Sequence, residues 1–462
     1  MVTDARMIKR LVVFGATGDL MGRYLFDGLA ALHAGGQLPE GFQLTGSARD
    51  DWDSAQFRTW ATEQLDQHAS DRPKQSRQAV VAASAYHRAD VTDAKSVAAA
   101  IEGDGPVAVY LALPPVVFAP AVAALKDAEL PPGSRIVLEK PFGEDLASAA
   151  ALNRLLAQVL PEPAVFRVDH FLAMTTVQNL LGFRLANRLI EPIWNSAHIA
   201  EIDIVWEETL ALEGRAGYYD GAGALKDMLQ NHLLQVFCLV AMEPPVSYGE
   251  RDLRDRKVDV LRSVRPITER DLARRTRRAR YTAGSIGGRE IPAYAEEPGV
   301  DPKRQTETFA EFELELDNWR WAGTRFRLRS AKAMGLDRKE VAVRFRDVPH
   351  LPNLPTTMNA APNVLRFGLE PESMHLELTS VSDRPDELSP LTLETELEPP
   401  SLPAYGQLLL NVLNHDATLS IRGDEAEESW RVVAPVIDGW SRNLVPMETY
   451  PAGSQGPLRA PA

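Results

Sequence analysis

A short apolar run that ends in a glycine-containing turn constrains this chain more than any other feature. The segment 11–20 reads LVVFGATGDL, so that strand-forming residues lead into Gly15-x-x-Gly18 and then into a helix pattern that continues through Ala31. Such a turn places backbone N–H groups and the positive end of a helix where a pyrophosphate can bind. Because the spacing is shorter than G-x-G-x-x-G, a tight turn that binds no ligand stays open as the alternative.

The rest of the first third alternates strand and helix patterns. Further apolar runs at 42–48, 107–113 and 135–140 are each followed by helix-like sequence. Strands that alternate with helices need crossover connections, and this predicts a parallel sheet covered on both faces. We therefore expect residues 1–170 to form a Rossmann-like, doubly wound dinucleotide-binding domain.

The pattern changes from about Ile202 onward. The segments 201–208, 308–316 and 340–348 alternate apolar and polar residues, as strands do in an antiparallel sheet with one solvated face. A long helix pattern lies between them, at about 222–242. We expect residues 171–462 to form an α+β domain with a large, mainly antiparallel sheet and helices.

Charge and composition narrow the classes of partner. The 462 residues carry a net charge of −14, which disfavours binding to nucleic acids and to anionic lipids. The basic stretch 273–280 (ARRTRRAR) has two readings, a nucleic-acid contact or a solvated charged face, and the lack of aromatic residues favours the second. The apolar segment 107–125 contains three prolines, so we expect a strand and a turn there and not a membrane span.

The single cysteine, Cys238, excludes an intrachain disulfide, and the N-terminal residues do not resemble a signal peptide. Both features indicate the reducing cytoplasm.

The end of the second predicted strand bears on the choice of cofactor. NAD-specific folds usually carry an acid at this position, where the ribose is bound. Here the strand ends in Arg49, whose positive charge suits a 2′-phosphate and so favours NADP over NAD. Asp50 and Asp51 follow directly and weaken this assignment.

Several motifs occur in an order that is typical of one enzyme family. They are FGATGDL (14–20), YLALPP (110–115), EKPFG (139–143), RVDHFL (167–172), EGRAGYYDGAGALKDMLQNHLLQ (213–235), DNWRW (317–321) and DATLSIRGDE (416–425). With these motifs the chain closely resembles the glucose-6-phosphate dehydrogenases over nearly its whole length. The resemblance implies an NADP-dependent oxidation of glucose 6-phosphate at C1 to 6-phosphogluconolactone, the first step of the oxidative pentose phosphate pathway.

The resemblance also implies a role for individual residues. It makes His232 the general base, because histidine titrates near working pH, and Asp169 the carboxylate that orients it. It assigns substrate binding to His170, Lys140, Glu208, Asp227 and Lys332, and it makes the Lys140–Pro141 bond commonly cis. It assigns cofactor binding to Gly15, Ala16, Thr17, Gly18, Asp19, Leu20, Arg49, Pro114, Pro115 and Lys140. No metal is expected, and a homodimer or a dimer of dimers is expected through the antiparallel sheet.

The chain departs from the family where the substrate phosphate is held. Phe171 and Met174 replace a tyrosine and a lysine, Tyr24 replaces a lysine near the active centre, and Asp337 replaces a basic residue. A hydrogen bond to a charged group is worth roughly 1.5–3 kcal/mol, so these changes weaken phosphate binding unless other cations compensate. Whether Arg23, Arg338 or Lys339 compensates is left open by the sequence.

Two alternatives follow from these departures. One is the same chemistry on an unphosphorylated or C6-modified aldose, and the other is a non-catalytic regulatory paralogue. The retained Asp169, His232, Lys140 and Glu208 argue against the second.

Overall fold

The computed structural model describes residues 7–214, 216–350, 361–381, 388–398 and 400–458. They form two compact units, each of which is described by itself. The first comprises Met1–Met174, Pro245–Asp255 and Pro400–Trp430, and the second comprises Thr175–Pro244, Arg256–Pro399 and Arg431–Ala462. The division of the chain at residues 170 and 171 stays a prediction. Two segments from later in the sequence, 245–255 and 400–430, belong to the first compact unit.

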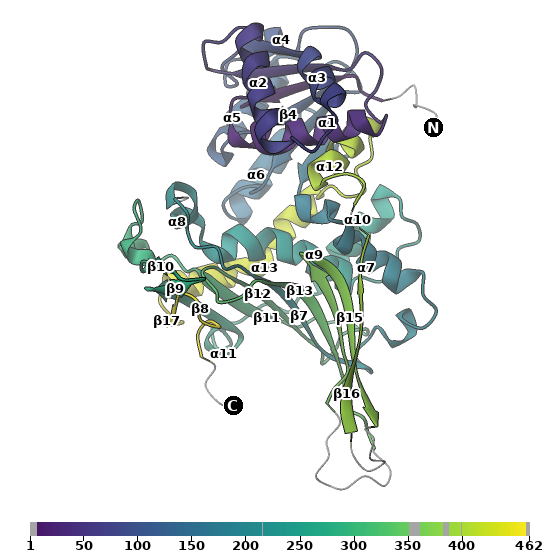
Figure 1. Cartoon of the computed structure of the whole chain (residues 1–462), viewed down its shortest axis with the longest axis vertical. Coiled ribbons are helices and arrows are strands. Elements are labelled where there is room, and N and C mark those ends of the chain that lie inside the picture. The colour runs from purple at the N-terminus through teal and green to yellow at the C-terminus, as the bar shows by residue number, and fades with distance from the viewer. Residues whose placement is uncertain (1–6, 215, 351–360, 382–387, 399, 459–462) are drawn as a thin grey trace. The chain divides into compact units, whose positions relative to one another are not determined.

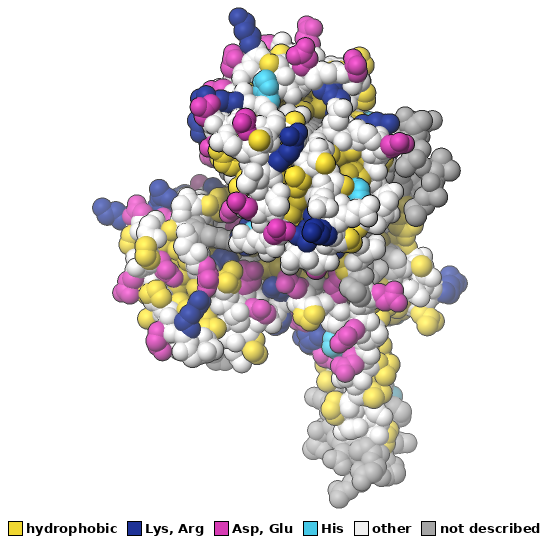
Figure 2. Space-filling view, turned by 45° about the horizontal axis from the view of Figure 1, so that its top comes forward, with side chains coloured by type: hydrophobic (Ala, Val, Ile, Leu, Met, Phe, Trp, Pro, Cys, Tyr) yellow, Lys and Arg dark blue, Asp and Glu magenta, His cyan; other side chains and the backbone are white. Residues whose placement is uncertain are grey.

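The surface carries charges of both signs. Figure 2 shows Lys and Arg side chains interspersed with Asp and Glu over the face that is drawn. Among the described residues, no helix combines the length and the apolar character that crossing a membrane requires.

The first unit contains a six-stranded sheet in the order β3-β2-β1-β4-β5-β6. Every neighbouring pair is parallel. The strands are β1 (Arg10–Phe14), β2 (Gln43–Ala48), β3 (Ser84–Arg88), β4 (Val107–Leu111), β5 (Arg135–Glu139) and β6 (Val165–Val168). This order is the doubly wound arrangement of dinucleotide-binding folds and confirms the predicted Rossmann-like architecture. The sequence patterns did not identify the short strands β3 and β6.

Helices cover both faces of this sheet. They are η1 (Met21–Leu25), α1 (Phe26–Ala34), α2 (Ser54–His68), α3 (Lys74–Ala82), α4 (Ala94–Ile101), α5 (Phe118–Asp127), α6 (Leu146–Leu156) and α12 (Ala404–Asn414). Asp53, Asp93 and Asp145 begin α2, α4 and α6, because each carboxylate accepts a hydrogen bond from a free N–H of the first turn. Helix α1 packs on α2, α3 and α12, whereas α5 packs on α4 and α6. Right-handed crossovers place these two sets on opposite faces.

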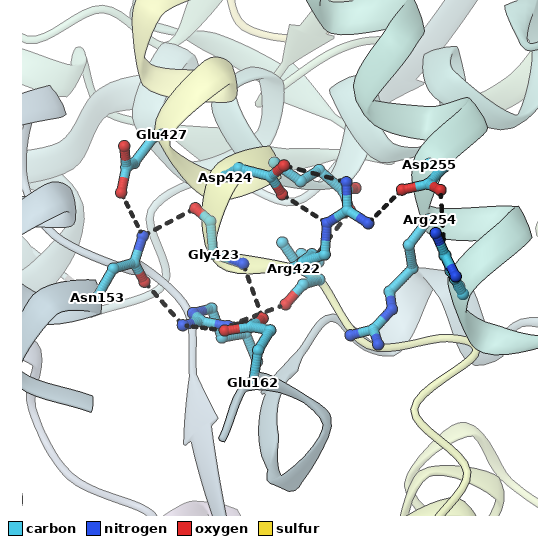
Figure 3. A network of polar contacts seen from close by, with 12 residues as sticks. Asn153, Glu162, Arg254, Asp255, Arg422, Gly423, Asp424 and Glu427 are labelled. Carbon is cyan, nitrogen blue, oxygen red and sulfur yellow. Dashed lines mark hydrogen bonds and ion pairs between the residues drawn. The ribbon is translucent and has the colours of Figure 1, made fainter. Parts of the chain in front are cut away.

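A polar network fixes the late segment 400–430 to this unit (Figure 3). The buried guanidinium of Arg167 lies 2.7 Å from a carboxylate oxygen of Glu162, which also accepts a hydrogen bond from the N–H of Gly423 at 2.9 Å. Arg422 forms an ion pair of 2.5 Å with Asp255. Apolar residues of α12 complete the attachment, since they belong to the same core as β1 and α1.

The second unit is built on a nine-stranded sheet in the order β16-β15-β14-β13-β7-β12-β11-β8-β17. Its strands are β7 (Ile199–Glu207), β8 (Thr276–Thr282), β11 (Phe309–Leu314), β12 (Arg325–Ala331), β13 (Arg338–Phe345), β14 (Val364–Leu369), β15 (Glu372–Val381), β16 (Leu388–Glu396) and β17 (Met447–Pro451). Only the β7–β12 and β8–β17 pairs of these described strands are parallel, so the sheet is mainly antiparallel, as predicted. The β15–β16 hairpin extends beyond the body of the sheet (Figure 1), and β9 (Gly284–Ile286) with β10 (Arg289–Ile291) forms a separate ribbon.

The helices of the second unit are α7 (Thr175–Leu185), α8 (Ala216–Ala224), η6 (Leu225–Leu233), α9 (Leu234–Ala241) and α11 (Leu272–Arg275). Helices α10 (Glu250–Ser263) and α13 (Gly423–Ser441) each begin in the first unit and end in the second. The predicted helix at 222–242 is present, but the chain kinks at Gly223, where φ is 67° and ψ is 173°. After the kink, η6 is a π-helical stretch, and every residue of α9 is buried.

The polar face of the second sheet is less solvated than the alternation of residues predicts. Arg327 lies between Glu201 and Asp203, at 3.0 and 2.5 Å, and each of these three side chains is only 13% exposed. Neighbouring strands place basic and acidic residues side by side, so the long side chains cover one another.

The interpretation of 273–280 as a solvated charged face is wrong. This segment runs through α11 into β8, which is an interior strand between β11 and β17. Arg275 and Arg278 are buried, and their guanidinium groups donate hydrogen bonds to the backbone carbonyls of Glu313 and Val445. Arginine satisfies buried carbonyl groups through its planar set of donors, and sequence composition does not reveal this use.

Candidate active site

The glycine turn of the first unit is built by a close approach of two strands. Gly15 has a φ of 82°, and a Cβ at this position would lie 2.1 Å from the carbonyl oxygen of Ala112. Only glycine fits there. The N–H groups of Gly15 and Ala16 both donate to the carbonyl of Ser47, at 2.8 and 3.1 Å. These two donors therefore tie the turn to β2, and they do not face a ligand.

A cavity of about 570 Å³ opens beside this turn, at the carboxyl ends of β1, β2 and β4. Ligands bind at this edge of doubly wound sheets, and the volume lies in the range of small-molecule sites. Of the predicted cofactor residues, the lining includes Gly15, Thr17, Gly18, Arg49 and Pro114. The others, Ala16, Asp19, Leu20, Pro115 and Lys140, lie outside the lining of this cavity.

The charges in this cavity are mixed. Arg49 lines it together with Asp50 and Asp90. Asp50 accepts a hydrogen bond of 2.8 Å from the Thr17 hydroxyl, which removes part of its repulsion toward a bound anion. Hydrogen bonds from Thr92, together with the positive charge of Arg49, hold the pKa of Asp90 below its usual range. A cavity of sufficient volume beside the glycine turn, with one cation in its lining, fits a pyridine nucleotide.

The predicted substrate residues of the first unit follow β5 and β6. Lys140 comes directly after β5, and its bond to Pro141 is cis, as the resemblance predicts. Asp169 comes directly after β6 and is buried, and one of its carboxylate oxygens accepts the N–H of Phe171 at 2.9 Å. His170 begins the short helix η4 (His170–Ala173).

Two of the positions that depart from the family in this unit, Phe171 and Met174, carry side chains without a hydrogen-bond donor. Phe171 is buried, and Met174 is half-buried. The ring of Tyr24 stacks on Tyr405 with the centroids 5.2 Å apart, and the guanidinium of Arg23 lies over the Tyr24 ring, 6.0 Å from its centroid.

Two predicted substrate residues of the second unit form an ion pair. Strands β7 and β12 are parallel and in register, so that their carboxyl ends meet at one edge of the sheet. Glu208 follows β7 and Lys332 follows β12, and Lys332 Nζ lies 2.8 Å from Glu208 Oε2. The ammonium also lies 5.4 Å from the centroid of the Tyr219 ring, a cation–π contact.

Asp227 and His232 both lie on η6, which packs on β7, β11 and β12. Asp227 is half-buried and accepts a hydrogen bond of 3.3 Å from the Tyr218 hydroxyl. The imidazole of His232 is buried. Asp169 and His232 belong to different compact units, and the role of each stays a prediction.

Glu307 fixes the start of this helix, and the sequence did not identify it. One carboxylate oxygen accepts the N–H of Leu225 at 3.0 Å, and a Cβ on Gly223 would lie 2.4 Å from the same oxygen. Burial raises the pKa of Glu307 to about 7. The sequence GAGAL at 221–225 was the available signal for this contact. A glycine at positive φ has no Cβ and leaves room for an approaching side chain.

The basic and acidic residues that follow Lys332 are held by partners within the chain. Asp337 accepts a hydrogen bond of 2.6 Å from the N–H of Thr209. Arg338 forms an ion pair with Glu207 at 2.9 Å, and Lys339 forms one with Glu370 at 2.9 Å. Asp337 is therefore held beside Glu208 by the backbone, and the two cations are engaged by other carboxylates.

A second large cavity, of about 610 Å³, lies in the second unit, but its lining includes none of the predicted substrate residues. Its polar lining includes Lys226, Arg278, Arg304 and Glu307. Lys226 and Glu307 connect this cavity to the start of η6.

Comparisons with known proteins show the family of this chain. Residues 12–179 match the family model "Glucose-6-phosphate dehydrogenase, NAD binding domain", and residues 181–462 match "Glucose-6-phosphate dehydrogenase, C-terminal domain". The glucose-6-phosphate 1-dehydrogenase of Zymomonas mobilis is 37% identical over 98% of this chain and 96% of its own. That of Bacillus subtilis is 34% identical over 99% of this chain and 96% of its own.

Solved structures show the same relationship. The glucose-6-phosphate 1-dehydrogenase of Mycobacterium avium matches with a TM-score of 0.85 and 35% identity, over 98% of this chain and 95% of its own. A glucose-6-phosphate dehydrogenase in complex with its substrate glucose-6-phosphate matches with a TM-score of 0.88 and 28% identity, over 98% and 96%. The chain therefore belongs to the glucose-6-phosphate dehydrogenase family.

Proposed function

We propose that this protein oxidises glucose 6-phosphate at C1 with NADP as hydride acceptor, as the first step of the oxidative pentose phosphate pathway. The observation that carries the proposal is the arrangement at one edge of the second sheet. Glu208 and Lys332 meet there as an ion pair, and the helix with Asp227 and His232 packs on the same strands. The relatives named glucose-6-phosphate 1-dehydrogenase support the same activity.

In this mechanism His232 removes the proton of the C1 hydroxyl while C1 loses a hydride. A neutral imidazole suits this task, because its ordinary pKa lies near working pH. Glu208 and Asp227 accept hydrogen bonds from sugar hydroxyls, and His170, Lys140 and Lys332 bind the substrate. The role of Asp169 as the carboxylate that orients His232 is carried over from the family resemblance. A bound pyridine nucleotide supplies the hydride acceptor.

The preference for NADP over NAD rests on Arg49. This side chain lines the cavity beside the glycine turn, where a 2′-phosphate needs a cation. Asp50 is engaged by the Thr17 hydroxyl, which supports a net attraction for phosphate at this place.

We further propose a homodimer, or a dimer of dimers, that associates through the second sheet, and a cytoplasmic location. The dimer is carried over from the family resemblance, and the single Cys238 supports a reducing compartment. Light scattering after size exclusion tests the dimer, and a monomer at micromolar concentration contradicts it.

A second candidate is the same oxidation of an unphosphorylated or C6-modified aldose. It is favoured by one observation, namely that Arg338 and Lys339 are engaged by Glu207 and Glu370 while Phe171 and Met174 bring no donor. The third reading, a non-catalytic regulatory paralogue, has no structural observation in its favour.

Steady-state kinetics with glucose 6-phosphate, glucose and 6-deoxyglucose, each with NADP and with NAD, separate these candidates. The proposal predicts the highest kcat/KM with glucose 6-phosphate and NADP. A higher kcat/KM with glucose or 6-deoxyglucose supports the second candidate. NADP binding without any sugar oxidation supports the paralogue.

A further inference from the structure

A half-buried glutamate in the first unit is hydrogen-bonded by two tyrosines. Glu139 ends β5, and its Oε1 accepts a hydrogen bond of 2.5 Å from the hydroxyl of Tyr110 on β4. The hydroxyl of Tyr405, on α12, forms a second hydrogen bond with the same carboxylate. The three residues come from three elements that are distant in sequence, so this arrangement exists only in the folded unit.

The ring of Tyr405 also contacts two other rings. It stacks on the imidazole of His170, with the centroids 5.8 Å apart and the planes inclined by 18°. The ring of Tyr24 is a second neighbour, with the centroids 5.2 Å apart and an angle of 30°. Such a stack restricts the rotation of the imidazole, because tilting it would separate the two rings.

The carboxylate of Glu139 lies close enough to Lys140, its neighbour in sequence, for the two opposite charges to attract each other. The charged groups that face it are Lys140, which favours the ionised form, and Asp169, which opposes it. Tyr110 from β4 and Tyr405 from α12 stabilise the ionised form by hydrogen bonding. These hydrogen bonds therefore favour the charged form of the carboxylate next to the Lys140 ammonium.

We propose that Tyr405 is a positioning residue for the sugar-oxidising site: its hydroxyl, with that of Tyr110, holds Glu139 so that the carboxylate orients Lys140, and its ring fixes His170. This inference rests on the proposed function, in which Lys140 and His170 contact the substrate. Tyr405 does not itself need to touch the sugar.

The two roles of Tyr405 separate in two variants. Tyr405→Phe keeps the ring stack and removes the hydrogen bond, whereas Tyr405→Leu removes both. Burial raises the pKa of Glu139 to about 7, and the tyrosine hydrogen bonds oppose this rise. Loss of the Tyr405 hydroxyl therefore raises the pKa of Glu139 further. As the pH falls, Glu139 is then protonated at a higher pH than in the wild type, and Lys140 loses its negatively charged neighbour there.

The experiment measures kcat and KM for glucose 6-phosphate and glucose between pH 5.5 and 9 in the wild type, both variants and Tyr248→Phe. Tyr248 is an exposed tyrosine of the same unit and serves as the matched control. We expect Tyr405→Phe to shift the acidic limb of kcat/KM upward by about one pH unit with little change in the KM of either sugar. We expect Tyr405→Leu to raise the KM of glucose 6-phosphate about fivefold more than that of glucose.

The inference is overturned if the Tyr405→Phe profile coincides with that of the wild type, or if Tyr405→Leu affects both sugars equally and only lowers Tm. Infrared difference spectra against pH test the hydroxyl role without any turnover. The protonated-carboxyl band of Glu139, identified by its loss in Glu139→Gln, should have a higher midpoint in Tyr405→Phe. An unchanged midpoint overturns the inference even if the wild type oxidises no sugar, whereas inactivity of the wild type alone overturns only the proposed function.

Discussion

The ammonium of Lys332 lies 2.8 Å from the carboxylate of Glu208, although 124 residues separate them in the chain. Both residues are expected at the substrate, so a bound sugar phosphate has to share Lys332 with Glu208. The parallel pairing of β7 and β12 brings the two together, because each residue follows the last position of its strand.

Replacement of Lys332 by alanine tests its proposed contact with the phosphate. We expect kcat/KM for glucose 6-phosphate to fall about 10- to 100-fold, because a hydrogen bond to a charged group is worth roughly 1.5–3 kcal/mol. For glucose the fall should be much smaller. Lys339→Ala is the control, because Lys339 forms its ion pair with Glu370. An equal loss for both sugars in Lys332→Ala contradicts the assignment.

Restoring a cation at position 174 tests whether the phosphate lies near η4. Met174 is half-buried at the end of this helix, so a lysine there can reach a phosphate held by His170. We expect Met174→Lys to raise kcat/KM for glucose 6-phosphate about tenfold and to leave glucose unchanged. Leu146→Lys adds the same charge at an exposed position of the same unit and should have no such effect. No gain in Met174→Lys would mean that the phosphate binds elsewhere.

Arg49 is expected to determine the choice between NADP and NAD. Its replacement by alanine should raise the KM for NADP about 10- to 100-fold and change that for NAD less than about threefold, since only NADP carries the 2′-phosphate. Arg88, at the end of the neighbouring strand, pairs with Asp51 and provides the matched control. Equal effects of Arg49→Ala on both nucleotides would show that this side chain does not read the 2′ position.

Glu307 should make stability depend on pH. Burial raises its pKa from 4.5 to about 7, so the folded state binds a proton that the unfolded state has already released in this range. The stabilisation of the folded state by this proton is complete below about pH 4.5. It is lost as the pH rises through the pKa of Glu307 in the folded state, near 7.

Denaturant unfolding of Glu307→Gln against pH measures this effect. Relative to this variant, the free energy of unfolding of the wild type should fall by roughly 3 kcal/mol as the pH rises from about 4.5 to about 7. Glu296→Gln, an exposed neighbour, should follow the wild type. Parallel curves for the wild type and Glu307→Gln would show that Glu307 does not titrate in this range.

Local patterns were sufficient to predict the strand-turn-helix around Gly15 and the change to an alternating sheet after Ile202. They succeed there because each depends on residues close in sequence. The interpretation of 273–280 failed because the partners of Arg275 and Arg278 are backbone carbonyls of Glu313 and Val445, far along the chain. Whether a cation is buried depends on such long-range contacts, and the composition of the local sequence does not predict them.

The site shows the same limit. The motifs predict His232, Glu208 and Lys140 as site residues, and these roles stay predictions. The motifs do not point to Glu307 or Tyr405, because the contacts of these two residues form only on folding. Tyr405 in particular belongs to a segment that lies between β16 and β17 of the second sheet in sequence and yet packs in the first unit.

One measurement tests the central claim that a single imidazole accepts the proton of the C1 hydroxyl. In His232→Asn, kcat for glucose 6-phosphate should fall at least about a hundredfold, as expected for loss of a general base. NADPH binding, followed by its fluorescence, should remain, and the exposed His198→Asn should retain full turnover. Turnover of His232→Asn equal to that of the wild type would contradict the account.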